Sequence, residues 1–105
     1  MDNSEYLRCV DEILEKIDDK LDELDLDIDL EMGDGKLIIL FEDNQQYIIN
    51  RQSANQQLWL AEPSGGWHFD LKDGQFICDK RGLDILRTLE ILISEKLSRK
   101  ILLTS

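Results

Sequence analysis

The densest chemical feature of the chain is a run of carboxylates between Lys16 and Glu31. Its sixteen residues hold eight carboxylates and only two lysines, in a chain of 105 residues with a formal net charge of −11. Like charges at helical i,i+4 spacing cost about 0.2–0.5 kcal/mol per pair, so folding alone gains nothing from them. Carboxylates at this density attract cations and basic protein surfaces, and these are the two chemistries that the run offers.

The acidic side chains share one side of each element that the run crosses. On a helical wheel, two neighbouring acidic rows lie opposite the apolar stripe. Farther along, strict alternation over 25–31 predicts a half-buried strand with its acids on one side and its leucines and isoleucine on the other. We call the resulting strip the acidic ridge, and it consists of Asp11, Glu12, Glu15, Asp18, Asp19, Asp22, Glu23, Asp25, Asp27, Asp29 and Glu31.

The residues alone leave three interpretations of the acidic ridge open. The first is a solvated helix face that aids solubility, although such faces usually mix both signs of charge. The second is an open, weak site for iron, manganese, magnesium or calcium, because the ridge has oxygen ligands and neither histidine nor cysteine. The third is a docking surface for basic protein. An EF-hand is excluded, since Leu30 and Lys36 stand where that motif requires glycine and glutamate.

The spacing of apolar residues predicts the elements that position the ridge. A helical stripe predicts a helix over 4–24, after which the period changes to that of a strand over 25–31. Short apolar runs between turn residues predict further strands at 36–42, 46–51, 57–61, 67–71 and 75–78. A second helical pattern runs from about 82 to 97. The stripe of the first helix consists of Tyr6, Val10, Ile13, Ile17, Leu21 and Leu24.

The order α-β-β-β-β-β-β-α predicts an α+β fold. We expect a two-layer sandwich, with two helices packed on one face of a roughly six-stranded antiparallel sheet. By size, residues 1–105 form a single domain without a linker or an internal repeat. The apolar tail at 101–103 is expected to fold back along the helices.

Net charge and motif content exclude several classes of function. A surface this negative repels phosphate backbones and anionic lipid, so we expect neither nucleic acid nor a membrane as partner. The apolar runs are too short to span a bilayer and the opening residues lack the features of a signal peptide, so we expect a cytoplasmic protein. Cys9 and Cys78 are expected to be reduced, partly buried thiols. His68 has no readable triad partner and the glycines lie in hairpins, so we expect no enzyme.

One large aromatic side chain is expected on the open face of the sheet. Alternation over 56–61 turns the leucines toward the helices and turns Trp59, with Gln57, away from them. By the same argument His68 and Asp70 point outward. A tryptophan among amides is either a contact for a protein partner or a cross-strand packing residue, and the pattern leaves both open.

Four segments of the chain resemble the frataxin family, and in particular its bacterial CyaY branch. They are Asn50-Arg51-Gln52, Gln57-Leu58-Trp59-Leu60-Ala61, Pro63-Ser64-Gly65-Gly66 and Trp67-His68-Phe69-Asp70, within a resemblance that covers residues 3–98. The resemblance implies the same α+β sandwich that periodicity predicts. It also implies a role in iron–sulfur cluster assembly, weak iron binding through carboxylates of the first helix and strand, and binding to the cysteine desulfurase complex.

The resemblance implies binding roles for particular residues of this chain. The implied ligands for iron, with other divalent cations as alternatives, are Asp11, Glu15, Asp18, Asp19, Asp22, Glu23, Asp25, Asp27 and Asp29. The implied partner contacts are Glu12, Asp18, Asp19, Asp22 and Glu23 toward the desulfurase, and Asn50, Gln52, Gln57 and Trp59 toward the cluster scaffold. Leu7 is a departure, since bacterial relatives can carry a metal-linked histidine there.

These expectations define an iron-binding regulator or iron donor of iron–sulfur cluster assembly that is not an enzyme. We expect a monomer, with iron-dependent oligomers as an alternative. The second hypothesis is an acidic adaptor that binds a basic partner without help from metal. Ferroxidase chemistry on the ridge is a more distant third. An effect of iron on desulfurase binding separates the first two hypotheses.

Overall fold

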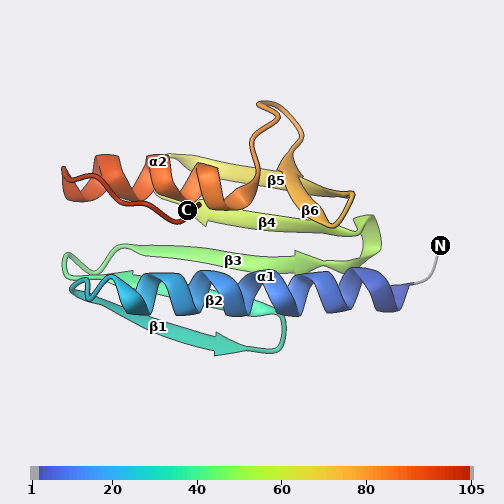
Figure 1. Ribbon diagram of the computed structural model, residues 1–105, viewed down its shortest axis with the longest axis horizontal. Helices are drawn as coiled ribbons and strands as arrows, with labels where there is room; N and C mark the ends of the chain where they lie inside the picture. Colours follow the sequence, from blue (N-terminus) through green and yellow to red (C-terminus); the bar gives the residue numbers. More distant parts are fainter. Residues whose placement is uncertain (1–2, 105) are drawn as a thin grey trace.

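The fold, taken from a computed structural model that describes residues 3–104, has two helices on one face of a six-stranded sheet (Figure 1). Strand order in the sheet follows chain order, and every neighbouring pair is antiparallel. The predicted α+β sandwich is confirmed. The elements are α1 (Asn3–Glu23), β1 (Ile28–Gly33), β2 (Lys36–Phe41), β3 (Gln46–Gln52), η1 (Ser53–Asn55), β4 (Gln57–Glu62), β5 (Gly65–Lys72), β6 (Gln75–Cys78) and α2 (Ile85–Leu97). Within residues 3–104, neither helix has the length and apolar character needed to cross a membrane.

The first strand begins later than its alternating pattern predicts, so the strand predicted for 25–27 is wrong. Asp25 has a left-handed backbone with φ of 51°, and its N–H donates to the carbonyl of Asp22 at 3.2 Å. The ladder between β1 and β2 starts only at the pair Ile28 and Phe41. Exposed acids and half-buried apolar residues nevertheless alternate across 25–31, as predicted. A short junction therefore carries the acidic pattern from helix to strand.

The second helix also begins later than its apolar pattern predicts. Gly82 has φ of 70° and lies in the loop before the helix. Asp84 then caps α2, because its Oδ1 accepts a hydrogen bond from the N–H of Arg87 at 2.8 Å. Such a cap satisfies a backbone donor that the first helical turn leaves without a partner. The helix proper therefore starts at Ile85.

The helix α1 packs on the sheet through a face rotated slightly from the predicted stripe. Cys9 and Leu14 are buried, whereas Ile13 and Leu24 are only partly buried. A helix lying along a sheet buries a broad apolar stripe, and a single row of i,i+3 and i,i+4 positions describes it incompletely. Cys9 and Cys78 are free thiols, and both are buried more fully than the partial burial that the sequence predicted.

Tyr6 ties the beginning of α1 to the connection between β3 and β4. Its hydroxyl donates to the carbonyl of Gln57 at 2.5 Å and accepts a hydrogen bond from the N–H of Gln52 at 3.1 Å. Burial raises the pKa of Tyr6, so the phenol keeps the proton that it donates. This contact fixes α1 against the start of the strand that carries Trp59.

The tail after α2 folds back onto the helices, as expected for 101–103, although Leu102 remains 49% exposed. Ile101 and Leu103 are buried, and Ser94 Oγ accepts a hydrogen bond from the N–H of Ile101 at 2.9 Å. Glu90, a buried carboxylate of α2 that the sequence interpretation missed, holds the end of the tail. Its Oε2 accepts hydrogen bonds from the N–H of Leu103 at 2.6 Å, the N–H of Thr104 at 2.8 Å and the Thr104 hydroxyl at 2.6 Å.

The environment of Glu90 keeps this buried carboxylate charged. Burial by itself raises the pKa, but hydrogen bonds from Thr104, Leu103 and Arg87 together lower the pKa from 4.5 to about 2. The Arg87 guanidinium contributes through Nη1, which lies 2.8 Å from Oε1. Because the native state binds the proton more weakly than the unfolded chain, the stabilisation is present above pH 4.5 and is lost as the pH falls toward about 2.

We predict that Glu90→Gln lowers the free energy of unfolding by about 2–3 kcal/mol at pH 7, because an amide cannot accept all the hydrogen bonds that the carboxylate receives. Chemical denaturation at pH 7 and at a series of acidic pH values measures the effect. The gap between wild type and variant should narrow as the pH approaches about 2. Glu95→Gln, at an exposed position of the same helix, is the control. Equal effects of the two substitutions at pH 7 would contradict the proposed role of Glu90.

Candidate functional site

The helical part of the acidic ridge lies on the side of α1 opposite its buried face. Ten of the eleven ridge residues are exposed, and Asp18 is half-buried. The buried face of the same helix packs against the core, so packing of α1 sets where these carboxylates point. The predicted ridge residues of α1 therefore share one exposed surface.

The ridge turns around the edge of the sheet at β1. Asp29 pairs with Leu40 and Glu31 pairs with Ile38. In β2 these two partners alternate with the buried residues that face the helices. Paired residues share a face of the sheet, so Asp29 and Glu31 point to the open face, away from the helices. The predicted strip is therefore two acidic surfaces joined through the junction between α1 and β1.

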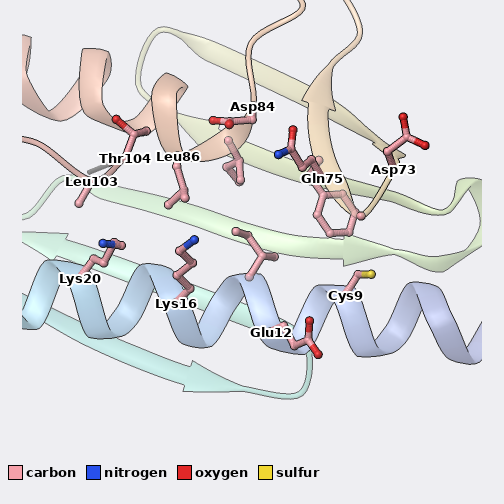
Figure 2. Close-up of a pocket in the computed structure, with 14 residues that line it drawn as sticks. Cys9, Glu12, Lys16, Lys20, Asp73, Gln75, Asp84, Leu86, Leu103 and Thr104 are labelled. Carbon is pink, nitrogen blue, oxygen red and sulfur yellow. The ribbon is translucent and has the colours of Figure 1, made fainter.

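Few basic side chains neutralise the ridge. Within residues 3–104, Glu12 is the only ridge carboxylate in an ion pair, with Arg8 Nη1 at 2.9 Å from Glu12 Oε1. The two lysines of the acidic run, Lys16 and Lys20, line the groove between α1 and α2, which measures about 550 Å³ (Figure 2). They also border a shallow hollow with the ridge residues Glu12, Glu15, Asp19 and Glu23, so the ridge has two lysines along one side only. The ridge therefore keeps most of its negative charge.

Repulsion within the ridge affects the pKa of Asp18. Partial burial raises this pKa, and the charges of Asp19 and Asp22 raise it further. Asp18 and Asp22 are i,i+4 neighbours, a spacing at which like charges destabilise a helix. A proton or a bound cation relieves this repulsion, so the electrostatics of α1 favour cation binding.

A second point of carboxylate repulsion involves Glu42, which the sequence interpretation missed. A hydrogen bond to the side chain of Asp27 is the main cause of a raised pKa at Glu42, followed by the charge of Asp27. Two neighbouring carboxylates repel one another and can share a hydrogen bond once one of them is protonated, so the pair binds a proton more readily than an isolated carboxylate does. The register of the hairpin formed by β1 and β2 could have indicated this contact. Asp27 and Glu42 lie next to the pair Ile28 and Phe41, which begins the ladder.

The ridge offers oxygen ligands without a preformed metal cage. Its donors are all carboxylates, which suit hard divalent cations. Across residues 3–104, no group of three or more His, Cys, Asp or Glu side chains is arranged to hold a metal ion. A cation at the ridge would gather its ligands by rotating exposed side chains.

The implied scaffold-binding residues lie together on the open face of the sheet. Asn50, Trp59 and His68 follow one another across β3, β4 and β5, with Gln52 and Gln57 paired in the next row. Trp59 is half-buried, and its indole stacks on the imidazole of His68 with ring centroids 4.3 Å apart and planes 12° apart. Cross-strand packing is therefore present, and the exposed part of the ring stays available to a partner. Asn50 Oδ1 is buried without a hydrogen-bond partner among the described residues.

Comparison with known proteins finds similarity to frataxins. A family model described as a frataxin-like domain matches residues 1–99. A Vibrio cholerae protein named iron-sulfur cluster assembly protein CyaY is 42% identical over 90 residues, which cover 86% of each chain. The protein of the same name from Vibrio vulnificus is 44% identical over 84 residues, covering 80% of this chain and 81% of that one.

Solved frataxin structures show the same fold. Frataxin from Psychromonas ingrahamii matches with a TM-score of 0.92 and 31% identity, covering 100% of both chains. Trimeric frataxin from the yeast Saccharomyces cerevisiae, complexed with ferrous iron, matches with a TM-score of 0.74 and 30% identity, covering 87% of both chains. The shared architecture includes both layers described above.

We predict that Glu42→Gln raises the melting temperature at pH 7 by about 1–3 °C, because it removes repulsion from the Asp27 carboxylate. The raised pKa of Glu42 means that the native state binds a proton more tightly than the unfolded chain. The repulsion is therefore absent in acid and appears as the pH rises, so the advantage of the variant should vanish at low pH. Thermal unfolding followed by circular dichroism, at pH 7 and at low pH, measures the difference in melting temperature between wild type and variant.

The matched control for this prediction is Glu31→Gln. Glu31 is an exposed ridge residue whose register partner is Ile38 rather than a carboxylate. Glu31→Gln should change the melting temperature less than Glu42→Gln does. A Glu42→Gln protein no more stable than this control would show that the two carboxylates do not repel one another measurably.

Proposed function

This chain belongs to the frataxin-like family, and we propose that it acts in iron–sulfur cluster assembly as an iron-binding regulator of cysteine desulfurase or as an iron donor. Two lines support the proposal. The Vibrio relatives are named for iron–sulfur cluster assembly, and the yeast relative was solved with ferrous iron. In this chain, the ridge has the charge and the exposure that a metal ion or a basic partner requires.

The observation that carries the proposal is an acidic surface with few counter-ions. A helix face kept only for solubility usually mixes charges, whereas Glu12 is the only ridge residue among the described ones that forms an ion pair. Repulsion at Asp18, and between Asp27 and Glu42, is a cost to the isolated protein. A cation or a basic surface that binds the native state offsets this cost.

In the proposed arrangement the α1 part of the ridge docks on a basic surface of the desulfurase. The open sheet face around Trp59 meets the iron–sulfur scaffold protein. The two surfaces lie on different sides of the molecule, so one molecule can contact both partners at once. Iron on the ridge changes the charge that the desulfurase meets, and docking therefore responds to iron.

The proposal assigns no catalytic residue. It expects ferrous iron to be oxidised no faster in the presence of the protein than in buffer. It places the protein in the cytoplasm as a monomer, with iron-dependent oligomers as the alternative because the yeast relative solved with ferrous iron is trimeric.

The second candidate function is an acidic adaptor whose docking does not depend on metal. The same unneutralised ridge supports it, because a basic partner relieves the repulsion as well as a cation does. The absence of a preformed cluster of ligands within residues 3–104 fits this function too. The two candidates differ in one result, the effect of iron on docking.

We predict that ferrous iron, and less selectively manganese or calcium, raises the melting temperature by about 2–6 °C at millimolar concentration, because the cation binds the clustered carboxylates of the native state. Thermal unfolding under anaerobic conditions, at constant ionic strength, measures the shift. Asp18→Asn, Asp19→Asn and Asp22→Asn together should remove most of it.

The matched control removes the same number of carboxylates elsewhere. Asp73→Asn, Asp79→Asn and Glu95→Gln change exposed positions outside the ridge and should leave the metal response intact. A wild-type protein that shows no rise in melting temperature, or a rise that both triple variants share, would count against a metal site on the ridge.

We predict that iron changes the affinity for cysteine desulfurase by about fivefold or more at constant ionic strength. Asp19→Lys with Asp22→Lys should weaken docking about tenfold or more, because the reversed charges repel a basic surface. Isothermal titration calorimetry under anaerobic conditions, with and without ferrous iron, measures both effects. Docking that needs the ridge but ignores iron would favour the adaptor, and docking indifferent to the charge reversal would exclude both functions.

A further inference from the structure

A chain of hydrogen bonds on the open face of the sheet holds the indole of Trp59. Trp59 Nε1 donates to Gln57 Oε1 at 2.8 Å, and Gln57 Nε2 donates to Asp70 Oδ1 at 2.9 Å. Gln57 and Asp70 are register partners on β4 and β5, one row away from the pair Trp59 and His68. We call Asp70, Gln57 and Trp59 the indole relay.

The direction of each hydrogen bond in the indole relay is fixed by chemistry. A charged carboxylate only accepts and an indole N–H only donates, whereas a primary amide has one donor group and one acceptor atom. Gln57 can therefore satisfy Asp70 and Trp59 together in one orientation of its amide. Asp70 selects that orientation, and the selected amide oxygen then fixes the edge of the indole.

The stack with His68 fixes the plane of the same ring. Its imidazole lies nearly parallel to the indole, with 12° between the planes. The indole relay holds one edge of the ring while the stack supports one face, so the ring of the half-buried Trp59 has little freedom left. An ordered aromatic side chain loses less entropy when a partner binds, and this favours affinity.

We infer that Asp70 is a positioning residue for the partner surface around Trp59. It acts through Gln57 and fixes the indole in its binding orientation before a partner arrives. The inference rests on the proposed function, since it takes Trp59 as a contact of the scaffold protein. Asp70 is not among the partner contacts that the family resemblance implies. The inference also gives Gln57 the role of holding the indole of Trp59.

Proton exchange at the two indole nitrogens tests the positioning step without any partner. In ¹H–¹⁵N spectra of the labelled protein, Asp70→Ala should shift the Trp59 indole signal and speed its exchange with water about threefold or more, because Gln57 is free to turn. Trp67, whose Nε1 donates to Glu62 Oε1 at 3.3 Å, is the internal reference and should not change. Asp70→Asn keeps an oxygen acceptor and should restore much of the protection. Trp59→Phe assigns the signals.

Scaffold binding tests the consequence of positioning. Asp70→Ala should weaken binding to the iron–sulfur scaffold protein about two- to tenfold, with Asp70→Asn closer to wild type. Glu95→Ala, which removes an exposed carboxylate of α2 instead of the half-buried Asp70, should bind as wild type does. Trp59→Ala sets the size of the effect expected when the contact itself is lost.

The outcomes distinguish a failure of the positioning role of Asp70 from a failure of the proposed scaffold contact at Trp59. An unchanged Trp59 indole signal in Asp70→Ala overturns the positioning role. If Asp70→Ala changes the Trp59 indole signal but binds the scaffold with wild-type affinity, while Trp59→Ala binds weakly, then positioning contributes nothing to binding. That result also overturns the positioning role of Asp70. Wild-type scaffold binding by Trp59→Ala shows that the proposed contact is wrong, and the inference about partner binding then falls with it, whatever the spectra show.

Discussion

Repulsion among the carboxylates of the acidic ridge is the constraint that the rest of the fold accommodates. Each like-charge pair on a helix costs about 0.2–0.5 kcal/mol, whereas burial of a large apolar side chain contributes about 1.5–3 kcal/mol. The helix α1 buries Tyr6, Val10, Leu14, Ile17 and Leu21 on its other face. Burial therefore outweighs repulsion, and α1 holds a concentrated charge that it would not keep as an isolated peptide.

Polar contacts at two places fix the helical layer, one between α1 and the sheet and one between α2 and the tail. Tyr6 ties the beginning of α1 to the connection before β4, and Glu90 ties the tail to α2 beside the groove that Lys16 lines. The carboxylates of α1 face away from the sheet while those of β1 face its open side. The fold thus offers two surfaces of different chemistry, one anionic on the helical side and one built around an aromatic stack on the other.

The parts of the fold and site that could be predicted from the sequence are those that the spacing of apolar residues reports. Spacing reports burial, so it predicted the sandwich, the exposed side of α1 and the outward direction of Trp59. It does not report backbone conformation, so it could not indicate that the left-handed Asp25 delays the start of β1 to Ile28. The contact of Glu42 depends on the hairpin register, and the role of Glu90 depends on the backbone donors of the tail, neither of which apolar spacing reports. The ligand roles of the ridge carboxylates came from family resemblance and stay predictions.

The central claim is that iron binds on the acidic ridge. The measurement that tests it most directly is an anaerobic titration of isotope-labelled protein with ferrous iron, followed through the backbone amide signals. Paramagnetic broadening falls steeply with distance, so it locates the ion. The account predicts that broadening begins within residues 11–31 and leaves the signals around Trp59 and His68 sharp. Broadening centred on His68, or spread evenly over the chain, would contradict it.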